Sequence, residues 1–382
     1  MKLSSLFSFL GIALSIYAAA NLYIWIHLAR VIPHLGSLKT PVFAGFWLLV
    51  AAFPLGRIGG AFFRCRFTDL LSIIGSWYMG IMVTAILLLA VLDILRLADH
   101  WFRVFPGSIA LRPGNARLAA FWIVLSLTVL TVAAGRWNAT NPAIREYDIT
   151  LRGTPREIPL RIAIATDLHV GLLVKNHWLA RMIGTINSTS PDIVLLVGDI
   201  VDSDVTNALE EKLSEELAMI SAPLGVFAVL GNHEFYAGAQ EAVRSFEAGG
   251  VKVLRDESIE IEGLFTLVGR DDRAASRRGA ARIPLSEISG VDGDLPAIVM
   301  DHNPSDLQEA VEASVALQVS GHTHRGQLWP FNFITNRIFE QDWGFLKKGE
   351  TLFYVSSGLG VWGPPIRTSS RPEVVVLNIS FQ

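Results

Sequence analysis

Cysteine is nearly absent from this sequence of 382 residues, and Cys65 alone excludes an intrachain disulfide framework. The sequence also has no internal repeat and no low-complexity tract. Acidic residues are scarce near the N-terminus: residues 1–136 contain 3 Asp, no Glu and 11 Lys or Arg, whereas the remainder contains 32 acidic and 21 basic residues. This asymmetry indicates that the two parts of the chain lie in different solvents.

The long apolar runs lie in the first part of the chain. A bilayer core of about 30 Å requires roughly 20 apolar residues in a helix. The candidate spans are residues 6–28, 41–56, 70–92 and 118–135. The second is short and ends at Arg57, although apolar residues continue to Phe63. We therefore predict a transmembrane domain of about four helices over residues 1–136, and the scarcity of acidic residues argues against a buried helical core in a soluble protein.

Membrane orientation is only weakly encoded. The basic residues that flank the spans divide almost evenly between the two sides, so the positive-inside rule does not discriminate. Ala18-Ala19-Ala20 resembles a signal-peptidase site, but apolar residues continue to Ile26 and favour an uncleaved anchor. If the N-terminus starts inside, four uncleaved spans return the chain to the cytoplasm. If the first span is cleaved off, the remaining three spans start outside and also end in the cytoplasm. We expect a multi-pass protein of the inner (plasma) membrane whose C-terminal domain is cytoplasmic.

The second part of the chain has a different pattern. Residues 137–158 contain Pro142 and Gly153 and are predicted to be a linker, and residues 159–382 alternate apolar runs with polar, helix-compatible stretches. Strands are predicted at Leu160–Thr166, Ile193–Val197, Gly225–Leu230, Phe265–Gly269, Ala297–Met300, Ala316–Val319, Thr351–Val355 and Val374–Ile379. Helices are predicted at His177–Ile186, Asn207–Ile220, Gln240–Ala248 and Ser305–Ala313. This alternation indicates a layered α/β domain with sheets between helices.

Residue types that bind metal ions stand where predicted strands end. Asp167 and His169 are two residues apart after the first strand, so both side chains can face one side. Asp199 follows Gly198 after the next strand and is the natural carboxylate to bridge a pair of ions. The remaining members, each also at a strand end, are Asn232 and His233 after Gly231, His302, and the pair His322 and His324 after Gly321.

This set of ligand types predicts a metal-dependent phosphoester hydrolase. Two divalent ions about 3.5–4 Å apart can activate a water and clamp a phosphate for in-line attack. Mixed carboxylate, amide and imidazole ligands suit Mn, Fe, Zn or Ni. A lone Asp-x-His or Gly-Asp is a weak signal, and Gly-Asn-His-Glu and Gly-His-Thr-His are fairly specific. All four in order at strand ends form a strong signal, because independent strand-end turns would rarely produce this series.

These motifs resemble those of the calcineurin-like metallophosphoesterase superfamily. The resemblance is strongest to a membrane-associated bacterial branch that includes the chlamydial-type UDP-2,3-diacylglucosamine pyrophosphatases. That branch shares an extended segment that reads here Gly321-His322-Thr323-His324-Arg325-Gly326-Gln327, followed by Gly358-Leu359-Gly360, Pro365, Arg367, Pro372 and Glu373. The resemblance covers about residues 158–382 and implies a four-layer α/β/β/α sandwich after the transmembrane domain.

The resemblance also implies a role for each site residue. One ion would be bound by Asp167, His169 and His324, the other by Asn232, His302 and His322, and Asp199 would bridge them. His233 would face the phosphate as a general acid or charge stabiliser, oriented by Asp202; the alternative is that His233 is a second ligand beside Asn232. The expected cofactor is a pair of divalent ions, with Mn²⁺ as the first choice and Fe, Zn or Ni as alternatives.

Several charged residues near the motifs have no single interpretation. Arg325 stands where the branch usually has Gly, and we expect Arg325 and Arg367 to bind substrate, although Arg325 can also point to solvent. Asp301 is interpreted either as a hydrogen-bond partner of an imidazole or as a surface carboxylate. The basic run from Arg270 to Arg282 is predicted to be a solvated loop or a contact for an anionic head group.

The leading hypothesis is a membrane-anchored hydrolase that cleaves a phosphodiester or pyrophosphate bond. A membrane tether favours a lipid-linked substrate such as UDP-2,3-diacylglucosamine, but substrate does not follow from fold. The alternatives are a phosphatase or phosphodiesterase acting on a soluble substrate, or a membrane sensor or transport protein with an accessory metal-binding domain. We expect no nucleic-acid partner, and the oligomeric state stays open.

Overall fold

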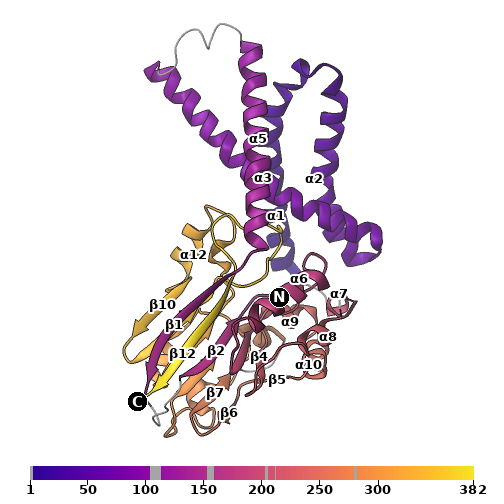
Figure 1. Cartoon of the computed structure of the whole chain (residues 1–382). Coiled ribbons are helices and arrows are strands. Elements are labelled where there is room, and N and C mark those ends of the chain that lie inside the picture. Colours follow the sequence, from indigo (N-terminus) through magenta and orange to yellow (C-terminus); the bar gives the residue numbers. More distant parts are fainter. Residues whose placement is uncertain (1–2, 104–112, 153–158, 203–204, 211, 279–281) are drawn as a thin grey trace. The chain divides into compact units, whose positions relative to one another are not determined.

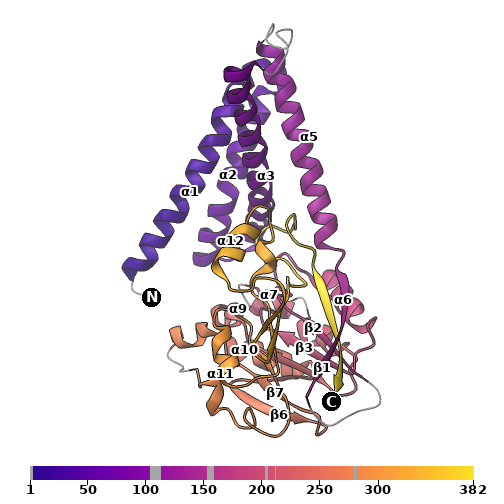
Figure 2. The same cartoon turned by 90° about the vertical axis from the view of Figure 1, so that its left-hand side faces the viewer.

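The computed structural model describes residues 3–103, 113–152, 159–202, 205–210, 212–278 and 282–382. The chain forms two compact units (Figures 1 and 2). The first consists of Met1–Arg136 with Gly363–Pro365, and the second of Trp137–Trp362 with Ile366–Gln382.

The first unit is helical. Its helices are α1 (Leu3–Ala29), α2 (Lys39–Phe62), α3 (Arg66–Phe102) and α5 (Pro113–Ala139), with short turns at Ile32–His34 and Gly36–Leu38. Within the part of the chain that the structure describes, four segments are long and apolar enough to cross a membrane: Gly11–His34, Gly36–Phe62, Arg66–Phe102 and Asn115–Ala139. The prediction of four apolar helices is therefore confirmed, and the short second run is completed by the residues up to Phe62.

The surfaces of these helices fit a lipid environment. No more than 17% of the residues in any of the four described windows are buried, whereas a soluble helical core buries an apolar face. Helices α2 and α3 approach through Gly56 and Gly75, where an added Cβ would overlap backbone atoms of the facing helix. Asp93 on α3 accepts a hydrogen bond from Tyr23 at 2.9 Å and lies 3.0 Å from Nε2 of His27, so the polar side chains of these helices pair with one another.

Two six-stranded sheets form the centre of the second unit. The first has the order β1 (Ala143–Leu151), β12 (Glu373–Phe381), β2 (Leu160–Ala165), β3 (Ile193–Val197), β4 (Val226–Val229) and β5 (Val251–Val253). The second has the order β10 (Gly344–Lys348), β11 (Thr351–Val355), β9 (Leu317–Ser320), β8 (Ala297–Met300), β7 (Phe265–Gly269) and β6 (Glu257–Ile261). Within each sheet, β2, β3, β4 and β5 and likewise β7, β8, β9 and β11 run parallel.

Three apolar cores hold these sheets in four layers, as predicted. The central core joins inward side chains of both sheets, such as Ile164 and Val319. A second core packs α6 (Asn176–Asn187), α8 (Leu213–Leu217) and α10 (Ala239–Ala248) on the outer face of the first sheet (Figure 1). A third packs α11 (Leu307–Glu312) against the second sheet. The order helix, sheet, sheet, helix follows from these contacts.

Two expectations need correction. The linker predicted over residues 137–158 is partly wrong, because Ala143–Leu151 form β1 and pair in parallel with β12. Arg145 interrupts the alternation of apolar and polar residues that would have predicted this strand. Its Nε lies 2.7 Å from Oε2 of the buried Glu373. The single helix predicted at Asn207–Ile220 is interrupted, because Lys212 adopts a left-handed conformation with φ 56° before α8 begins.

Candidate metal centre

The predicted site residues meet because parallel strands end at the same edge. The loops after β2, β3 and β4 carry the first predicted residues, and those after β8 and β9 carry the rest. Several of these residues adopt left-handed backbone conformations: Asp167 (φ 56°), His169 (φ 51°), Asp199 (φ 51°), His322 (φ 69°) and His324 (φ 49°). Such conformations cost on the order of 1–3 kcal/mol each and cluster at functional sites.

Asp167, His169 and His324 form one group of potential ligands, and all three are buried. Nε2 of His169 lies 3.0 Å from Nε2 of His324. Oδ1 of Asp167 lies 3.4 Å from Nε2 of His324 and 4.0 Å from Nε2 of His169. The backbone N–H of His322 donates to Oδ1 of Asp167 at 3.1 Å, which fixes the carboxylate.

Asp199, His302 and His322 form a neighbouring group. Oδ2 of Asp199 lies 3.1 Å from Nε2 of His302 and 3.9 Å from Nε2 of His169, so this oxygen stands between the two groups. The backbone N–H of His233 donates to Oδ1 of Asp199 at 2.9 Å. Asp199 is therefore placed as a bridging carboxylate would be.

The donor atoms fit divalent cations. Nδ1 of His302 donates to the carbonyl oxygen of Val197 at 2.8 Å, which leaves Nε2 as the nitrogen that faces Asp199. Oδ1 of Asn232 is buried and has no hydrogen-bond partner among the described residues. A buried acceptor of this kind costs free energy unless something pairs with it. A cation between the imidazole, amide and carboxylate atoms would satisfy all of them.

Three imidazoles, those of His169, His322 and His324, have lowered pKa values that agree with a ligand role. Burial disfavours the charged imidazole and lowers the pKa of His169 to about 3 and the pKa of His322 to about 4. Burial also holds the pKa of His324 well below its ordinary value. Neutral imidazoles can bind a cation without first releasing a proton. His302 differs, because the nearby Asp199 outweighs burial and raises the pKa of His302.

His233 and Asp202 lie beside these groups. Nδ1 of His233 is 3.3 Å from Oδ1 of Asp202, and the ring of His233 lies 4.7 Å from the ring of His169. Burial opposes the charge on His233, but the contact with Asp202 and the charge of Asp199 outweigh burial and raise the pKa of His233 to about 9. His233 is thus held as an imidazolium next to the ligand groups.

Glu234 is a residue whose role sequence reasoning missed. Its fully buried carboxylate accepts the backbone N–H groups of Gly231 at 2.7 Å, Val201 at 2.8 Å and Asp199 at 3.1 Å. These bonds join the loop after β3 to the loop after β4. Glu234 is the last residue of the Gly-Asn-His-Glu motif, and this position could have identified it from the sequence. Its role is to position Asp199.

Arg367 is placed differently from the prediction. Its guanidinium is fully buried and donates to the carbonyl oxygens of Ser357 and Gly360, both at 2.6 Å, and to Oγ of Ser370 at 3.0 Å. It also donates to Nδ1 of His324 at 3.1 Å. The predicted contact between Arg367 and substrate is therefore wrong, because the donors are used inside the fold. Arg367 instead orients His324.

Replacing Arg367 with Met should destabilise the fold and weaken metal binding by the group of Asp167, His169 and His324. Each buried acceptor left without a donor costs about 1–3 kcal/mol of the free energy of unfolding. Loss of a residue that orients a metal-binding imidazole typically weakens metal binding about 10- to 100-fold. Thermal unfolding and Mn²⁺ titration measure both effects. Arg371→Met is the control, since Arg371 is exposed and donates to the carbonyl oxygen of Asn141; equal effects of the two variants would contradict the positioning role.

Arg325 directly follows His324 in the chain and is half-buried. Its guanidinium carbon is 4.0 Å from the ring centroid of Trp343, a cation–π contact that holds a half-buried side chain. Nε1 of Trp343 in turn donates to Glu373 at 3.2 Å. Arg325 is therefore fixed in place, and its contact with substrate stays a prediction.

Asp301 and the basic run both have structural partners. Asp301 is 5% exposed and accepts a hydrogen bond from Arg282, so it is not a surface carboxylate. Within the described part of the chain its carboxylate pairs with Arg282 and not with His302. Arg270, at 1% exposed, pairs with Asp256 at 3.2 Å and with Glu309 at 3.1 Å. The solvated-loop interpretation is wrong for Arg270 and Arg282, whose charges are neutralised within the fold.

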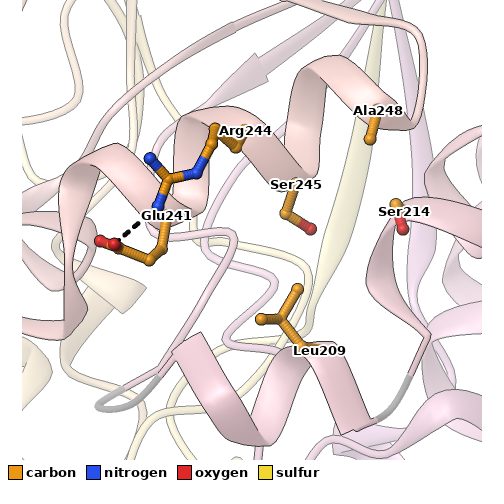
Figure 3. Close-up of a pocket in the computed structure, with 6 residues that line it drawn as sticks. All are labelled: Leu209, Ser214, Glu241, Arg244, Ser245 and Ala248. Carbon is orange, nitrogen blue, oxygen red and sulfur yellow. Dashed lines mark hydrogen bonds and ion pairs between the residues drawn. The ribbon is translucent and has the colours of Figure 1, made fainter.

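A separate cavity of about 310 Å³ lies among α7 (Val205–Glu210), α8 and α10 (Figure 3). It is lined by Leu209, Ser214, Glu241, Arg244, Ser245 and Ala248. Nη2 of Arg244 lies 2.7 Å from Oε1 of Glu241, so this charged pair neutralises itself. None of the predicted site residues lines the cavity.

The chain is similar to known proteins in sequence. Residues 160–326 match the family model for calcineurin-like phosphoesterases. An uncharacterized metallophosphoesterase of Aquifex aeolicus is 34% identical over 241 residues, which are 62% of this chain and 91% of that protein. A transmembrane protein with metallophosphoesterase domain from Danio rerio is 27% identical over 389 residues, or 94% of this chain and 86% of that protein. A crystal structure of a dimetal phosphatase from Danio rerio is 12% identical, with a TM-score of 0.37 over 53% of this chain and 88% of that chain.

The chain belongs to the calcineurin-like phosphoesterase family. By family it is a phosphoesterase hydrolase, and its clusters of His and Asp suggest a site for two metal ions. The four apolar helices, together with the relative named as a transmembrane protein, indicate a membrane protein.

Proposed function

We propose that this protein is a membrane-anchored, two-metal hydrolase that cleaves a phosphodiester or pyrophosphate bond. The observation that carries the proposal is the position of Asp199, whose Oδ2 lies 3.1 Å from His302 and 3.9 Å from His169. A single carboxylate oxygen between two sets of ligand-type atoms is the arrangement that a pair of ions requires.

Seven residues would hold the two ions. One ion would be bound by Asp167, His169 and His324, the other by Asn232, His302 and His322, with Asp199 shared. Divalent cations bound there would neutralise the phosphoryl oxygens and lower the pKa of an attacking water. Mn²⁺ is our choice of metal, because its ligand preferences cover carboxylate and imidazole, with Fe, Zn and Ni as alternatives.

His233 is the proposed general acid. Its imidazolium would donate a proton to the leaving oxygen, and Asp202 would keep the ring oriented and protonated. Arg325, which is held against Trp343 and follows His324, would contact a second negatively charged group of the substrate. Together these residues bind, orient and protonate the substrate around the ligand groups.

The proposed substrate is lipid-linked, with UDP-2,3-diacylglucosamine as the first compound to test. A site tethered to apolar helices would encounter substrates that partition into the bilayer, and the sequence motifs resemble those of pyrophosphatases acting on that lipid. We place the protein in the inner (plasma) membrane with its second unit in the cytoplasm. A soluble phosphoester is the alternative substrate, and a sensor or transport role for the first unit is compatible with either.

Substrate comparison tests the proposal. With Mn²⁺ added, the purified full-length chain should hydrolyse bis(p-nitrophenyl) phosphate and release UMP from UDP-2,3-diacylglucosamine. Hydrolysis of soluble nucleotides at an equal or higher kcat/KM would contradict the lipid-linked assignment alone. Lack of hydrolysis of every phosphoester tested, with each of the four metals, would contradict the enzymatic proposal itself.

A further inference from the structure

An apolar surface lies beside the candidate metal centre. It consists of Trp329, Phe331, Phe333, Ile334 and Ile338 on and before α12 (Asn332–Ile338), together with Trp362, and is called here the α12 surface. Phe333 is 64% exposed and Ile338 is 69% exposed. Soluble proteins rarely leave such side chains together in water, so a concentration of them marks a contact surface.

The α12 surface is connected to the site. The ring of Trp362 lies 6.2 Å from the ring of His233, and the ring of Phe339, directly after α12, lies 6.0 Å from the ring of His322. The side chain of Gln327, two residues before Trp329, is bonded to Trp362, because Nε2 of Gln327 donates to the carbonyl oxygen of Trp362 at 2.8 Å and Oε1 accepts from the backbone N–H of Trp362 at 2.9 Å. Whatever covers the α12 surface therefore borders the place where substrate would bind.

The same compact unit contains the end of the last apolar helix. The candidate span Asn115–Ala139 finishes with residues that belong to the second unit from Trp137 onward. Asn138, in that last turn, donates to the carbonyl oxygens of Arg367 at 3.0 Å and Ser370 at 2.9 Å. The end of a membrane-spanning helix lies at the bilayer interface. The loop of residues 366–370 must therefore be near that interface.

This loop is bonded in turn to the start of the α12 surface. The backbone N–H of Trp329 donates to Oγ1 of Thr368 at 2.9 Å, and the backbone N–H of Thr368 donates to the carbonyl oxygen of Gln327 at 2.9 Å. Trp329 is thus connected to the end of the span by two hydrogen bonds, one between Trp329 and Thr368 and one between the neighbouring Arg367 and Asn138. Trp and Phe side chains favour the membrane–water interface, and Arg337, exposed in the last turn of α12, adds a cation suited to lipid phosphates.

We propose that the α12 surface docks on the lipid bilayer, with its aromatic and aliphatic side chains among the head groups and the upper acyl chains. The bilayer is favoured over another protein because the surface is tied by hydrogen bonds to the end of an apolar span. Docking would bring the side of the site that includes Trp362 and His233 next to the lipid. It does not require hydrolysis and does not depend on which phosphoester is cleaved.

A fluorescent probe on the full-length chain tests this docking. The lone cysteine is first removed by Cys65→Ser, and an environment-sensitive dye is attached at Phe333→Cys. The matched control carries the dye at Glu260→Cys, an exposed position on β6, which lies at the opposite edge of the second sheet from β10, the strand after α12. Each chain is placed in nanodiscs of phosphatidylcholine with and without bromine on the acyl chains. A cooperative unfolding transition at the wild-type Tm confirms that both labelled chains are folded.

The proposal predicts a blue-shifted emission at position 333 that loses most of its intensity in the brominated nanodiscs, and no change at position 260. A dye at 333 that is as solvated and unquenched as the control would overturn it. A blue-shifted but unquenched dye would also overturn it, because the surface would then be covered by protein, such as a second copy of the chain. Since no substrate is present, these results are independent of whether the proposed hydrolysis is found.

Discussion

Asp199→Asn removes at least about 99% of the Mn²⁺-dependent hydrolysis of bis(p-nitrophenyl) phosphate in our account. Loss of a residue that only orients a metal ligand typically weakens metal binding about 10- to 100-fold. The effect at Asp199 should be at least as large, because Asp199 is the carboxylate that both ions would share. The neutral amide keeps the size of the side chain but removes the charge that balances two cations. Metal content measured after gel filtration should fall together with the rate.

Asp148→Asn is the matched control for this change. Asp148 lies on β1 of the same sheet, is exposed, and accepts a hydrogen bond from Asn378 at 2.9 Å. The same substitution there should leave both metal content and rate at the wild-type level. If Asp199→Asn retained two ions per chain and a wild-type rate, Asp199 would not be the bridging ligand.

His233→Ala lowers kcat by about 100- to 10,000-fold, the usual contribution of a general acid. Because His233 is outside the proposed ligand set, metal content should remain that of the wild-type chain. The alternative, that His233 binds metal beside Asn232, predicts loss of one ion instead. His177→Ala, an exposed histidine on α6, is the control for the substitution itself and should leave kcat unchanged.

The pH profile separates the roles of His233 and Asp202. The pKa of His233 is raised to about 9, so the acid form is present below that pH and is lost as pH rises through it. Activity that requires this proton should therefore fall as the pH rises through about 9, which gives the pH profile a falling limb there. Asp202→Asn removes the charge that favours the imidazolium, so the falling limb should move to lower pH, toward the ordinary histidine value of about 6.5. An unmoved limb would show that another group supplies the proton.

The fold was largely predictable because its strands are buried and continuous in their apolar character. Ile193–Val197 is fully buried, and such a run between polar stretches predicts a central parallel strand. β1 was missed because its inward face carries Arg145, which is neutralised by Glu373 from a strand more than two hundred residues later. β6 was missed for a similar reason, since its exposed Glu257 and Glu260 hide the pairing with β7. Edge strands depend on partners that local sequence does not reveal.

The ligand types of the site were predictable because motifs at the ends of parallel strands meet at one edge. The residues that contact these ligand types were not predictable, because they come from distant loops. Arg367 was expected to face substrate, yet it is buried against His324, and Asp301 pairs with Arg282. Whether a charged side chain in a loop faces the site or the interior depends on tertiary packing, which spacing along the sequence does not encode.

Anomalous diffraction from crystals of the full-length chain grown with Mn²⁺ tests the central claim most directly. Two peaks are expected, about 3.5–4 Å apart. One should lie among Asp167, His169 and His324, and the other among Asn232, His302 and His322, with Asp199 between them. A single peak, or peaks away from Asp199, would contradict a two-metal phosphoesterase site.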